Sequence, residues 1–386
     1  LARGTYGVTG AGIKIGILSD SFNDLGGEGT DIADGDLPAG GVTILREGPS
    51  GDTDEGRAMA ELIHRIAPGA QLYFATADFG ENTFASDIEA LKAAGCQIIV
   101  DDVSYLDEPF YQDGGIVQNA IHTVASEGVS YFTSAGNEGH EFYESAFRPI
   151  SVRLPNSSAP SVVHDFGGGN PFQSITIQPG ATALFILQWA QPFLDIGAGS
   201  HPALTDLAMQ LYNSNNIMVA AGEQLLQDPL EPVVGIEYTN NTANTNFRLD
   251  IIDENGVAPS LMKYISFDRG VTINDPNAGI GSGTVFGHAL NGDANTVGAV
   301  DWADTPSFGI SPPMIEPFSS IGPGEILFDA NGNPISSPLV TNKVNFAAPD
   351  GSSTSVFDPF FGTSAAAPDA AAVAALMLQA NANLDH

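Results

Sequence analysis

A serine at the start of an alanine-rich segment is the residue of this 386-residue chain best placed to act as a nucleophile. The segment reads FFGTSAAAPDAAAVAAL, with Ser364 ahead of a predicted buried helix and Pro368 in its first turn, where a missing N–H costs little. A serine at a helix N-terminus can cap the helix by accepting a backbone N–H. It can also attack a carbonyl group, whose oxyanion then binds the N–H groups of the first turn. The segment alone favours neither use.

An acidic helix start supplies the second reactive group. Residues 52–72 read DTDEGRAMAELIHRIAPGAQL, and apolar residues recur in them every four positions, as on one face of a helix. Glu55 lies at the beginning of this predicted helix, and the helix runs on to an Ala-Pro pair. We expect Asp52 and Asp54 to be first-turn charges that complement the helix dipole.

Strands and helices must alternate to position these groups. Residues 1–140 show short apolar runs separated by helical patterns, and the same style returns after residue 284. Such alternation predicts a parallel sheet covered by helices on both faces. Between the two portions lie short strand-like segments separated by Asn, Gly, Pro and Asp, which predict an antiparallel sandwich. We therefore expect an α/β domain formed by residues 1–140 and 284–386, interrupted by a β-sandwich domain at 141–283.

Three motifs make the chain resemble the subtilisin-like serine peptidases. GTSAAAP is similar to the nucleophile motif of that family, which implies that Ser364 is the nucleophile. GILSDSFN is similar to its first-strand motif, which implies that Asp20 is the triad aspartate, and YFTSAGNEG to its oxyanion segment, which implies that Asn137 is the donor. The order of these residues along the chain is that of the family. The β insertion is not part of the family core.

The resemblance also implies a substrate cleft. IIVDDVSYL is similar to the strand that lines the cleft in that family, so we expect Ser104 and Tyr105, together with Gly136, to bind the substrate as an added strand would. Asp101 and Asp102 end the same strand. They can bind substrate, tune a catalytic group or make structural hydrogen bonds, and we favour the structural role.

The chain departs from the family at the base. The subtilisin pattern places a histidine at the start of the second helix, where this chain has Glu55. The related sedolisins place a glutamate there, with a second acid four residues later, but that position is Met59 here. The chain thus resembles a subtilase with a sedolisin-like glutamate. His64 cannot substitute, since nine residues of helix turn it about 180° away and move it ~13 Å along the axis.

A glutamate can act as the base if its surroundings raise its basicity. A carboxylate with an ordinary pKa near ~4.3 is a weak base. We expect Asp20 and Glu55 to repel, to share one proton and to titrate as a pair with one raised pKa. The helix N-terminus opposes this effect by favouring ionised Glu55. If the repulsion prevails, a Ser-Glu-Asp triad works best in acid.

The charge and composition limit the partners. Twelve basic and 46 acidic residues give a net charge of −34, which argues against nucleic acid as a partner. No apolar run reaches the ~20 residues of a membrane span. We expect protein or peptide substrates and an extracellular or cell-surface location. The beginning LARGTYG is neither a signal peptide nor an initiator methionine, so we expect a mature or trimmed chain.

No cofactor is expected. Calcium in the acidic loop at residues 28–36 is an alternative without a recognisable ligand spacing. Cys96 is the single cysteine and stands at a helix-to-strand junction, where we expect a buried, inert thiol.

Three functions remain open. The first is a serine endopeptidase in which Ser364, Glu55 and Asp20 form the triad. The second is an inactive subtilase scaffold that binds through its β insertion, and the third is an esterase or amidase. The retained serine, aspartate and asparagine favour the peptidase. The oligomeric state and the substrate specificity are not indicated by the sequence.

Overall fold

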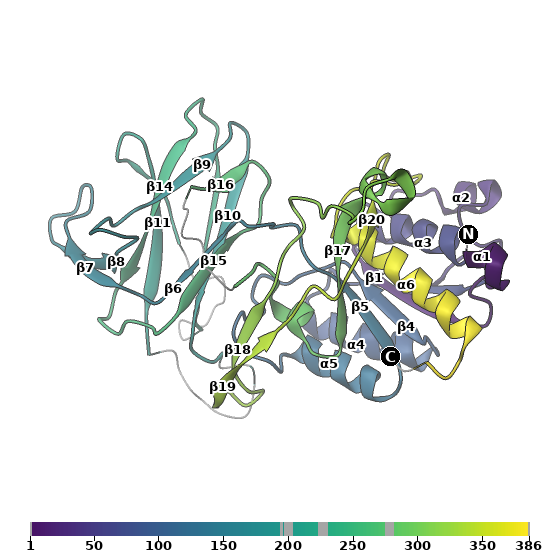
Figure 1. The fold of residues 1–386 in the computed structure, drawn as a ribbon. Coiled ribbons are helices and arrows are strands. Elements are labelled where there is room, and N and C mark those ends of the chain that lie inside the picture. The colour runs from purple at the N-terminus through teal and green to yellow at the C-terminus, as the bar shows by residue number, and fades with distance from the viewer. Residues whose placement is uncertain (1, 194–195, 197–203, 223–230, 275–281, 385–386) are drawn as a thin grey trace.

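The computed structural model describes residues 2–193, 196, 204–222, 231–274 and 282–384. Two units are connected side by side, an α/β unit and a unit made of β-strands (Figure 1). The first and last parts of the chain build the α/β unit, and strands β6 to β16 build the other. The predicted fold class, a helix-covered parallel sheet interrupted by an antiparallel sandwich, is confirmed.

A seven-stranded parallel sheet forms the centre of the α/β unit, in the order β2-β3-β1-β4-β5-β17-β20. Its strands are β1 (Lys14–Ser19), β2 (Thr43–Arg46), β3 (Gln71–Thr76), β4 (Ile98–Asp101), β5 (Ser130–Ser134), β17 (Ala294–Asp301) and β20 (Phe346–Asp350). Most of these strands are apolar and buried, as strands covered on both faces are. Because they are parallel, their carboxyl ends meet at one edge, where such sheets bind ligands.

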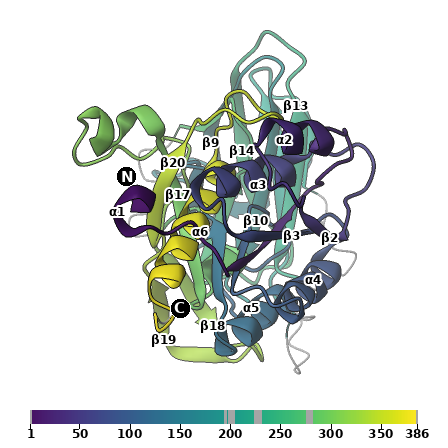
Figure 2. The same cartoon turned by 90° about the vertical axis from the view of Figure 1, so that its right-hand side faces the viewer.

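Helices cover both faces of this sheet. One face carries α3 (Glu55–Ile66) and α6 (Thr363–Ala380), whose small side chains share a core with the sheet. The other carries α4 (Glu81–Ala93) and α5 (Ile116–Ser126), whose core includes the buried Cys96. Burial raises the pKa of that thiol to about 12. Figure 2 looks onto this unit, with the β unit behind it.

Two short helices come before α3 in the chain. These are α1 (Ala2–Tyr6) and α2 (Glu28–Asp34). The acidic segment at residues 28–36, expected as a loop, is therefore mostly helix. Its Asp31 is buried and pairs with Arg57, which explains why an acidic segment folds here. Among the described residues, no group of three or more His, Cys, Asp or Glu side chains is arranged to hold a metal ion.

Two antiparallel sheets face each other in the inserted unit. The first has the order β13-β10-β15-β6 and consists of β6 (Phe142–Ser145), β10 (Thr182–Trp189), β13 (Val233–Thr239) and β15 (Met262–Ser266). The second contains β7 (Pro149–Val152), β8 (Ser161–His164), β9 (Gln173–Ile177), β11 (Leu207–Asn213), β12 (Met218–Ala221), β14 (Asn246–Asp253) and β16 (Val271–Ile273). Side chains from both sheets form one apolar core between them, as in a sandwich.

The inserted unit packs against the α/β unit through an apolar cluster. Phe110 and Tyr111, from the segment after β4, share this cluster with side chains of the first antiparallel sheet. Gln188 of β10 reinforces the contact: its Oε1 accepts the N–H of Phe110 at 2.7 Å, and its Nε2 donates to the carbonyl of Glu108 at 2.9 Å. The two units therefore share a core instead of being joined by a linker alone.

A hairpin that the sequence analysis did not predict contributes to the same cluster. It consists of β18 (Gly324–Phe328) and β19 (Pro334–Thr341), and Phe328 is its buried member. Three 3₁₀ helices also lie in this part of the chain, at Gly287–Leu290, Trp302–Asp304 and Pro306–Phe308.

Candidate active site

Asp20 holds the start of helix α3. It follows β1 directly, and its Oδ1 accepts the N–H of Glu55 at 2.8 Å. Its Oδ2 accepts the N–H and the hydroxyl of Thr53 at 2.7 and 2.5 Å, and the N–H of Ser21 also donates to Oδ1. The first N–H groups of a helix have no partner within the helix, so a carboxylate from another element satisfies one here. Asp20 therefore fixes the backbone of Glu55.

Gly56 allows α3 to begin against the sheet. Its N–H donates to the carbonyl of Ser21 at 3.1 Å. A Cβ on residue 56 would overlap the Phe74 ring and would lie 2.8 Å from the Ser21 carbonyl oxygen. Only glycine fits this close approach.

Asp54 ties the loop after β1 to the helix. It precedes α3 in the left-handed region, with φ of 59°. Its carboxylate accepts the hydroxyl of Ser21 at 2.8 Å and the N–H of Asp24 at 2.7 Å, and it pairs with Arg57 at 2.9 Å. Asp52 also lies before the helix. The prediction that both are first-turn charges is wrong, because α3 begins at Glu55.

Ser364 is the second residue of α6. The N-cap is Gly362, so Ser364 does not serve as the cap. The exposed fraction of Ser364 is 9%, and the three alanines after it are buried in the core. Pro368 lies inside the helix, beyond the predicted first turn. It has no N–H to donate to the Ser364 carbonyl, four residues before it.

Asn137 connects the strand β5 to the start of α6. Its Oδ1 accepts the N–H and the hydroxyl of Thr363 at 3.0 and 3.2 Å. The Thr363 hydroxyl also accepts the N–H of Gly136 at 3.2 Å. These bonds hold the Asn137 amide next to Ser364. They involve its Oδ1, and its Nδ2 does not bind Thr363. The predicted oxyanion segment and the predicted nucleophile are thus brought together.

The Glu55 carboxyl interacts with the Ser364 hydroxyl and with the Asp102 carboxyl. Burial raises the pKa of Glu55, while hydrogen bonds with Ser364 and Asp102 lower it and the charge of Asp20 raises it. The net effect is a raised pKa. A carboxylate with a raised pKa is a stronger base, as a group that must take a proton from a hydroxyl needs to be.

Asp102 is a further neighbour of Glu55, and this contact matches the tuning role that the sequence left open for it, not the structural role that it favoured. It follows β4 directly, as Asp20 follows β1. Burial raises its pKa well above the ordinary value, and the charges of Glu55, Asp101 and Asp20 add to this, while a hydrogen bond with Ser19 opposes it. The predicted Asp20–Glu55 carboxyl pair is therefore replaced by a different one. Asp20 contacts the main chain of Glu55, and Asp102 contacts its carboxyl.

Asp101 belongs to a separate buried ion cluster. Its Oδ1 lies 3.2 Å from Nε2 of His288 and accepts the hydroxyl of Thr133 at 2.8 Å. Nδ1 of His288 lies 2.7 Å from Glu108. Burial by itself lowers the pKa of His288, but the charges of Glu108 and Asp101 outweigh it and raise the pKa well above the ordinary value. Adjacent strand residues point to opposite faces, which separates Asp101 from Asp102.

The predicted cleft residues follow two neighbouring strands: Ser104 and Tyr105 come after β4, and Gly136 comes after β5. Ser104 is exposed and Tyr105 half-buried. The Tyr105 hydroxyl donates to the carbonyl of Ala77 at 2.6 Å, so this hydroxyl is already occupied. Gly136 has φ of 95°, a conformation that favours glycine. Substrate binding by Ser104, Tyr105 and Gly136 stays a prediction.

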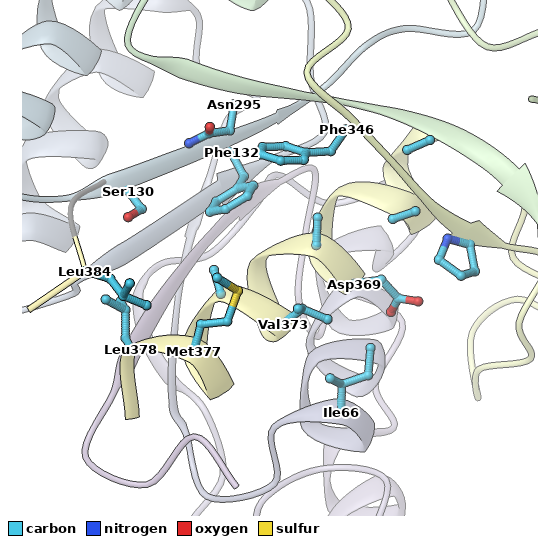
Figure 3. A pocket seen from close by; sticks show the side chains of 15 residues that line it. Ile66, Ser130, Phe132, Asn295, Phe346, Asp369, Val373, Met377, Leu378 and Leu384 are labelled. Carbon is cyan, nitrogen blue, oxygen red and sulfur yellow. The ribbon is translucent and has the colours of Figure 1, made fainter. Parts of the chain in front are cut away.

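A large apolar groove lies apart from these residues. Its volume is about 550 Å³, and α6 and the strands β5 and β20 line it. Figure 3 shows Asp369, Val373 and Met377 along the helix, with Phe132 and Phe346 from the sheet. None of the residues around Glu55 and Ser364 contributes to it. The groove is therefore not the site of the predicted chemistry.

Comparisons with known proteins concern the family and the fold of the chain. The sequence model described as the subtilase family matches residues 43–386. The chain is similar in structure to the Clostridium perfringens CspB protease, with a TM-score of 0.54 and 11% identity over 98% of this chain and 84% of that one. The MycP3 protease from the type VII (ESX-3) secretion system gives a TM-score of 0.34 and 15% identity, over 100% of this chain and 76% of that one. Comparison with curated proteins gave no match. No helix among the described residues has the length and apolar character needed to cross a membrane.

Proposed function

Because this chain belongs to the subtilase family, a family of serine-type peptidases, we propose that it is a serine endopeptidase whose triad consists of Ser364, Glu55 and Asp20. The observation that carries the proposal is the position of the Glu55 carboxyl beside the Ser364 hydroxyl, at the N-termini of two helices. The substrate is a protein or peptide.

The reaction follows from this geometry. Glu55 takes the proton of the Ser364 hydroxyl while its oxygen forms a bond to the carbonyl carbon of the substrate. The Asn137 amide and the N–H of Ser364 in the first turn of α6 bind the oxyanion. Glu55 then passes the proton to the leaving amine as the C–N bond breaks. Water attacks the acyl-enzyme by the same steps, and Ser364 recovers its proton.

Asp20 has an orienting role in this proposal. It accepts the N–H of Glu55 and holds the first turn of α3 against the end of β1. Its negative charge also raises the pKa of Glu55. Asp20 thus acts on the base without taking part in the proton transfer.

An acidic optimum belongs to the same proposal. The base must be ionised before it can accept a proton, so activity rises with pH through the raised pKa of Glu55. The base is a carboxyl group and not a histidine, whose ordinary pKa is about 6.5, and several further carboxyls surround the site. We therefore expect the pH optimum below ~7. A pH optimum at or above about 8 would contradict the proposal. The excess of acidic residues is compatible with an extracellular, acidic medium, and an extracellular location is part of the proposal.

Three variants test the assignment. Glu55→Gln, Glu55→His and Ser364→Ala are assayed on denatured protein from pH 3 to pH 9. Glu55→Gln removes the base and retains the shape, and we expect it to lower kcat by about 10⁴-fold, as loss of a triad member does. Ser364→Ala gives the background rate. Glu55→His is expected to move any remaining activity toward neutral pH. Unchanged turnover in Glu55→Gln would refute the mechanism.

Labelling separates the peptidase from the two alternatives. A serine-directed phosphonate should modify Ser364 within the range pH 3–8. Absence of labelling across this range would favour a binding protein on an inactive subtilase scaffold. Cleavage of small esters without cleavage of casein would instead favour an esterase or amidase.

A further inference from the structure

The Asp102 carboxyl contacts the proposed base, Glu55, and is not a member of the proposed triad. We propose that Asp102 is a positioning residue that shares a single proton with Glu55 and holds that proton while Glu55 accepts the one from Ser364. This inference rests on the proposed function, because it assumes that Glu55 is the base.

The contact between the two carboxyls needs a proton. The carboxyls of Asp102 and Glu55 interact with each other across the gap between the end of β4 and the start of α3. Ionised carboxylates only accept hydrogen bonds, so two of them in contact have no donor. Oδ1 of Asp102 is inaccessible to solvent and has no hydrogen-bond partner. A proton held between Asp102 and Glu55 supplies the missing donor.

Asp20 is not available for this role. Its two oxygens already accept N–H groups of Ser21, Thr53 and Glu55, as well as the Thr53 hydroxyl. All four partners are donors, and a proton on Asp20 would displace one of them. The structure thus separates the two functions that one triad aspartate was expected to combine. Asp20 holds the backbone of Glu55, and Asp102 holds its carboxyl.

The carboxyl pair of Asp102 and Glu55 is surrounded by negative charges, and a proton is what neutralises it. From β1 and the loop before α3, the pair faces the negative charge of Asp20, which is itself close to Asp52 and Asp78. From β4 it faces Asp101. The nearby cations are bound elsewhere: Arg57 pairs with Asp31 and Asp54, and His288 lies between Asp101 and Glu108.

One shared proton keeps the charge of the site constant during the reaction. Before attack, Asp102 carries the proton and donates it to ionised Glu55, so the pair has one negative charge. When Glu55 takes the Ser364 proton, both carboxyls are neutral and the negative charge is on the substrate oxyanion. If Asp102 were ionised as well, the oxyanion would form beside an additional buried negative charge, which opposes it. Protonation of both carboxyls before attack would leave no base.

This account predicts a bell-shaped pH profile with a separate cause for each limb. The acid limb reports uptake of the second proton by the pair, and the alkaline limb reports loss of the first. Asparagine at position 102 is a permanent donor that cannot be deprotonated. We therefore expect Asp102→Asn to retain kcat within about tenfold at the optimum, and to lose the alkaline limb or move it up by more than about one pH unit. Asp102→Ala lacks the donor and should lower kcat at every pH.

Asp52→Asn is the matched control. Asp52 lies in the same acidic surroundings, and burial raises its pKa to about 6, so its titration is an alternative cause of the alkaline limb. We expect Asp52→Asn to retain that limb. The inference is overturned if Asp52→Asn removes the limb, or if Asp102→Asn lowers kcat equally at all pH values without moving either limb. Activity in Glu55→Gln would instead refute the proposed function itself, so the two failures can be distinguished.

Infrared spectroscopy tests the shared proton if Asp102→Asn does not fold. The Ser364→Ala protein should show a protonated carboxyl band at neutral pH, and the part of it that the shared proton contributes should be lost when Glu55→Gln is added, while the part from Asp369 remains. Persistence of the whole carboxyl band in that double variant would overturn the inference. Circular dichroism of each variant establishes that the comparison is made between folded proteins.

Discussion

Gly56→Ala tests whether the position of the base depends on a single close approach. The added Cβ would overlap Phe74, which is fully buried, and would lie 2.8 Å from the Ser21 carbonyl oxygen, which is part of the backbone. Neither neighbour is the free end of a flexible side chain. The start of α3 must therefore move away from β1, and Glu55 moves with it.

Two effects of Gly56→Ala on the free energy of unfolding oppose each other, and the steric cost is the larger one. Replacing glycine by alanine in a helix stabilises by about 0.5–1 kcal/mol. Forcing an additional methyl group into a packed core costs about 1–3 kcal/mol. We expect a net loss of about 1–2 kcal/mol in the free energy of unfolding. A displacement of a catalytic group by ~1 Å lowers the rate about 100-fold, which is the loss expected in kcat/KM.

Urea unfolding and peptidase assays measure both quantities, with Gly29→Ala as the control. Gly29 lies in α2, and a Cβ there meets nothing within 4 Å. Gly29→Ala should leave kcat/KM unchanged and stabilise by up to about 1 kcal/mol. If Gly56→Ala is also stabilised and fully active, the close approach does not position the base, and the reasoning is wrong.

Two further predictions concern buried ionisable groups. His288→Gln leaves Asp101 and Glu108 buried without their cation, which we expect to cost about 3 kcal/mol in the free energy of unfolding. Because the folded-state pKa of His288 is raised, this contribution is complete below its ordinary pKa and declines as pH rises through the folded-state pKa, so urea unfolding should give the largest difference from wild type near pH ~5. Burial raises the pKa of Asp369 to about 8, against the weaker opposing charge of Arg65, so the folded protein binds a proton there that the unfolded chain releases. Its stability is therefore lost as pH rises from ~4 to 8, and Asp369→Asn should stabilise by about 2 kcal/mol at pH 7 and by little at pH 4, as thermal unfolding at both pH values will measure.

The sequence predicted the elements more fully than their contacts. Alternating strands and helices follow from local apolar spacing, so the parallel sheet and its covering helices were accessible without a structure. The motifs around Ser364, Asp20 and Asn137 were accessible because each is a short continuous segment of the sequence. Asp102 was visible as an acid at a strand end, but nothing local indicates that it meets Glu55, 47 residues earlier in the chain. That contact depends on strand order and on which face of β4 the side chain occupies.

Two elements were missed for different reasons. The helix α2 has an acidic, glycine-containing sequence typical of a loop, and its buried ion pair with Arg57 overrides that local preference. The hairpin of β18 and β19 did have a local signal. Its turn contains Asn331-Gly332, a pair that favours tight turns between strands, and Asp329 accepts the N–H groups of Asn331 and Asn333.

The contact between Gln188 and the segment after β4 limits which segments of the gene can be exchanged by recombination. The inserted unit supplies Gln188, while the α/β unit supplies Glu108, Phe110 and the backbone that leads from the cleft strand. Recombination that exchanged the insertion alone would leave the N–H of Phe110 buried without an acceptor and its ring without part of its packing. The segment after β4 and the insertion are therefore expected to be exchanged together. Substitutions in either part are expected to be compensated in the other.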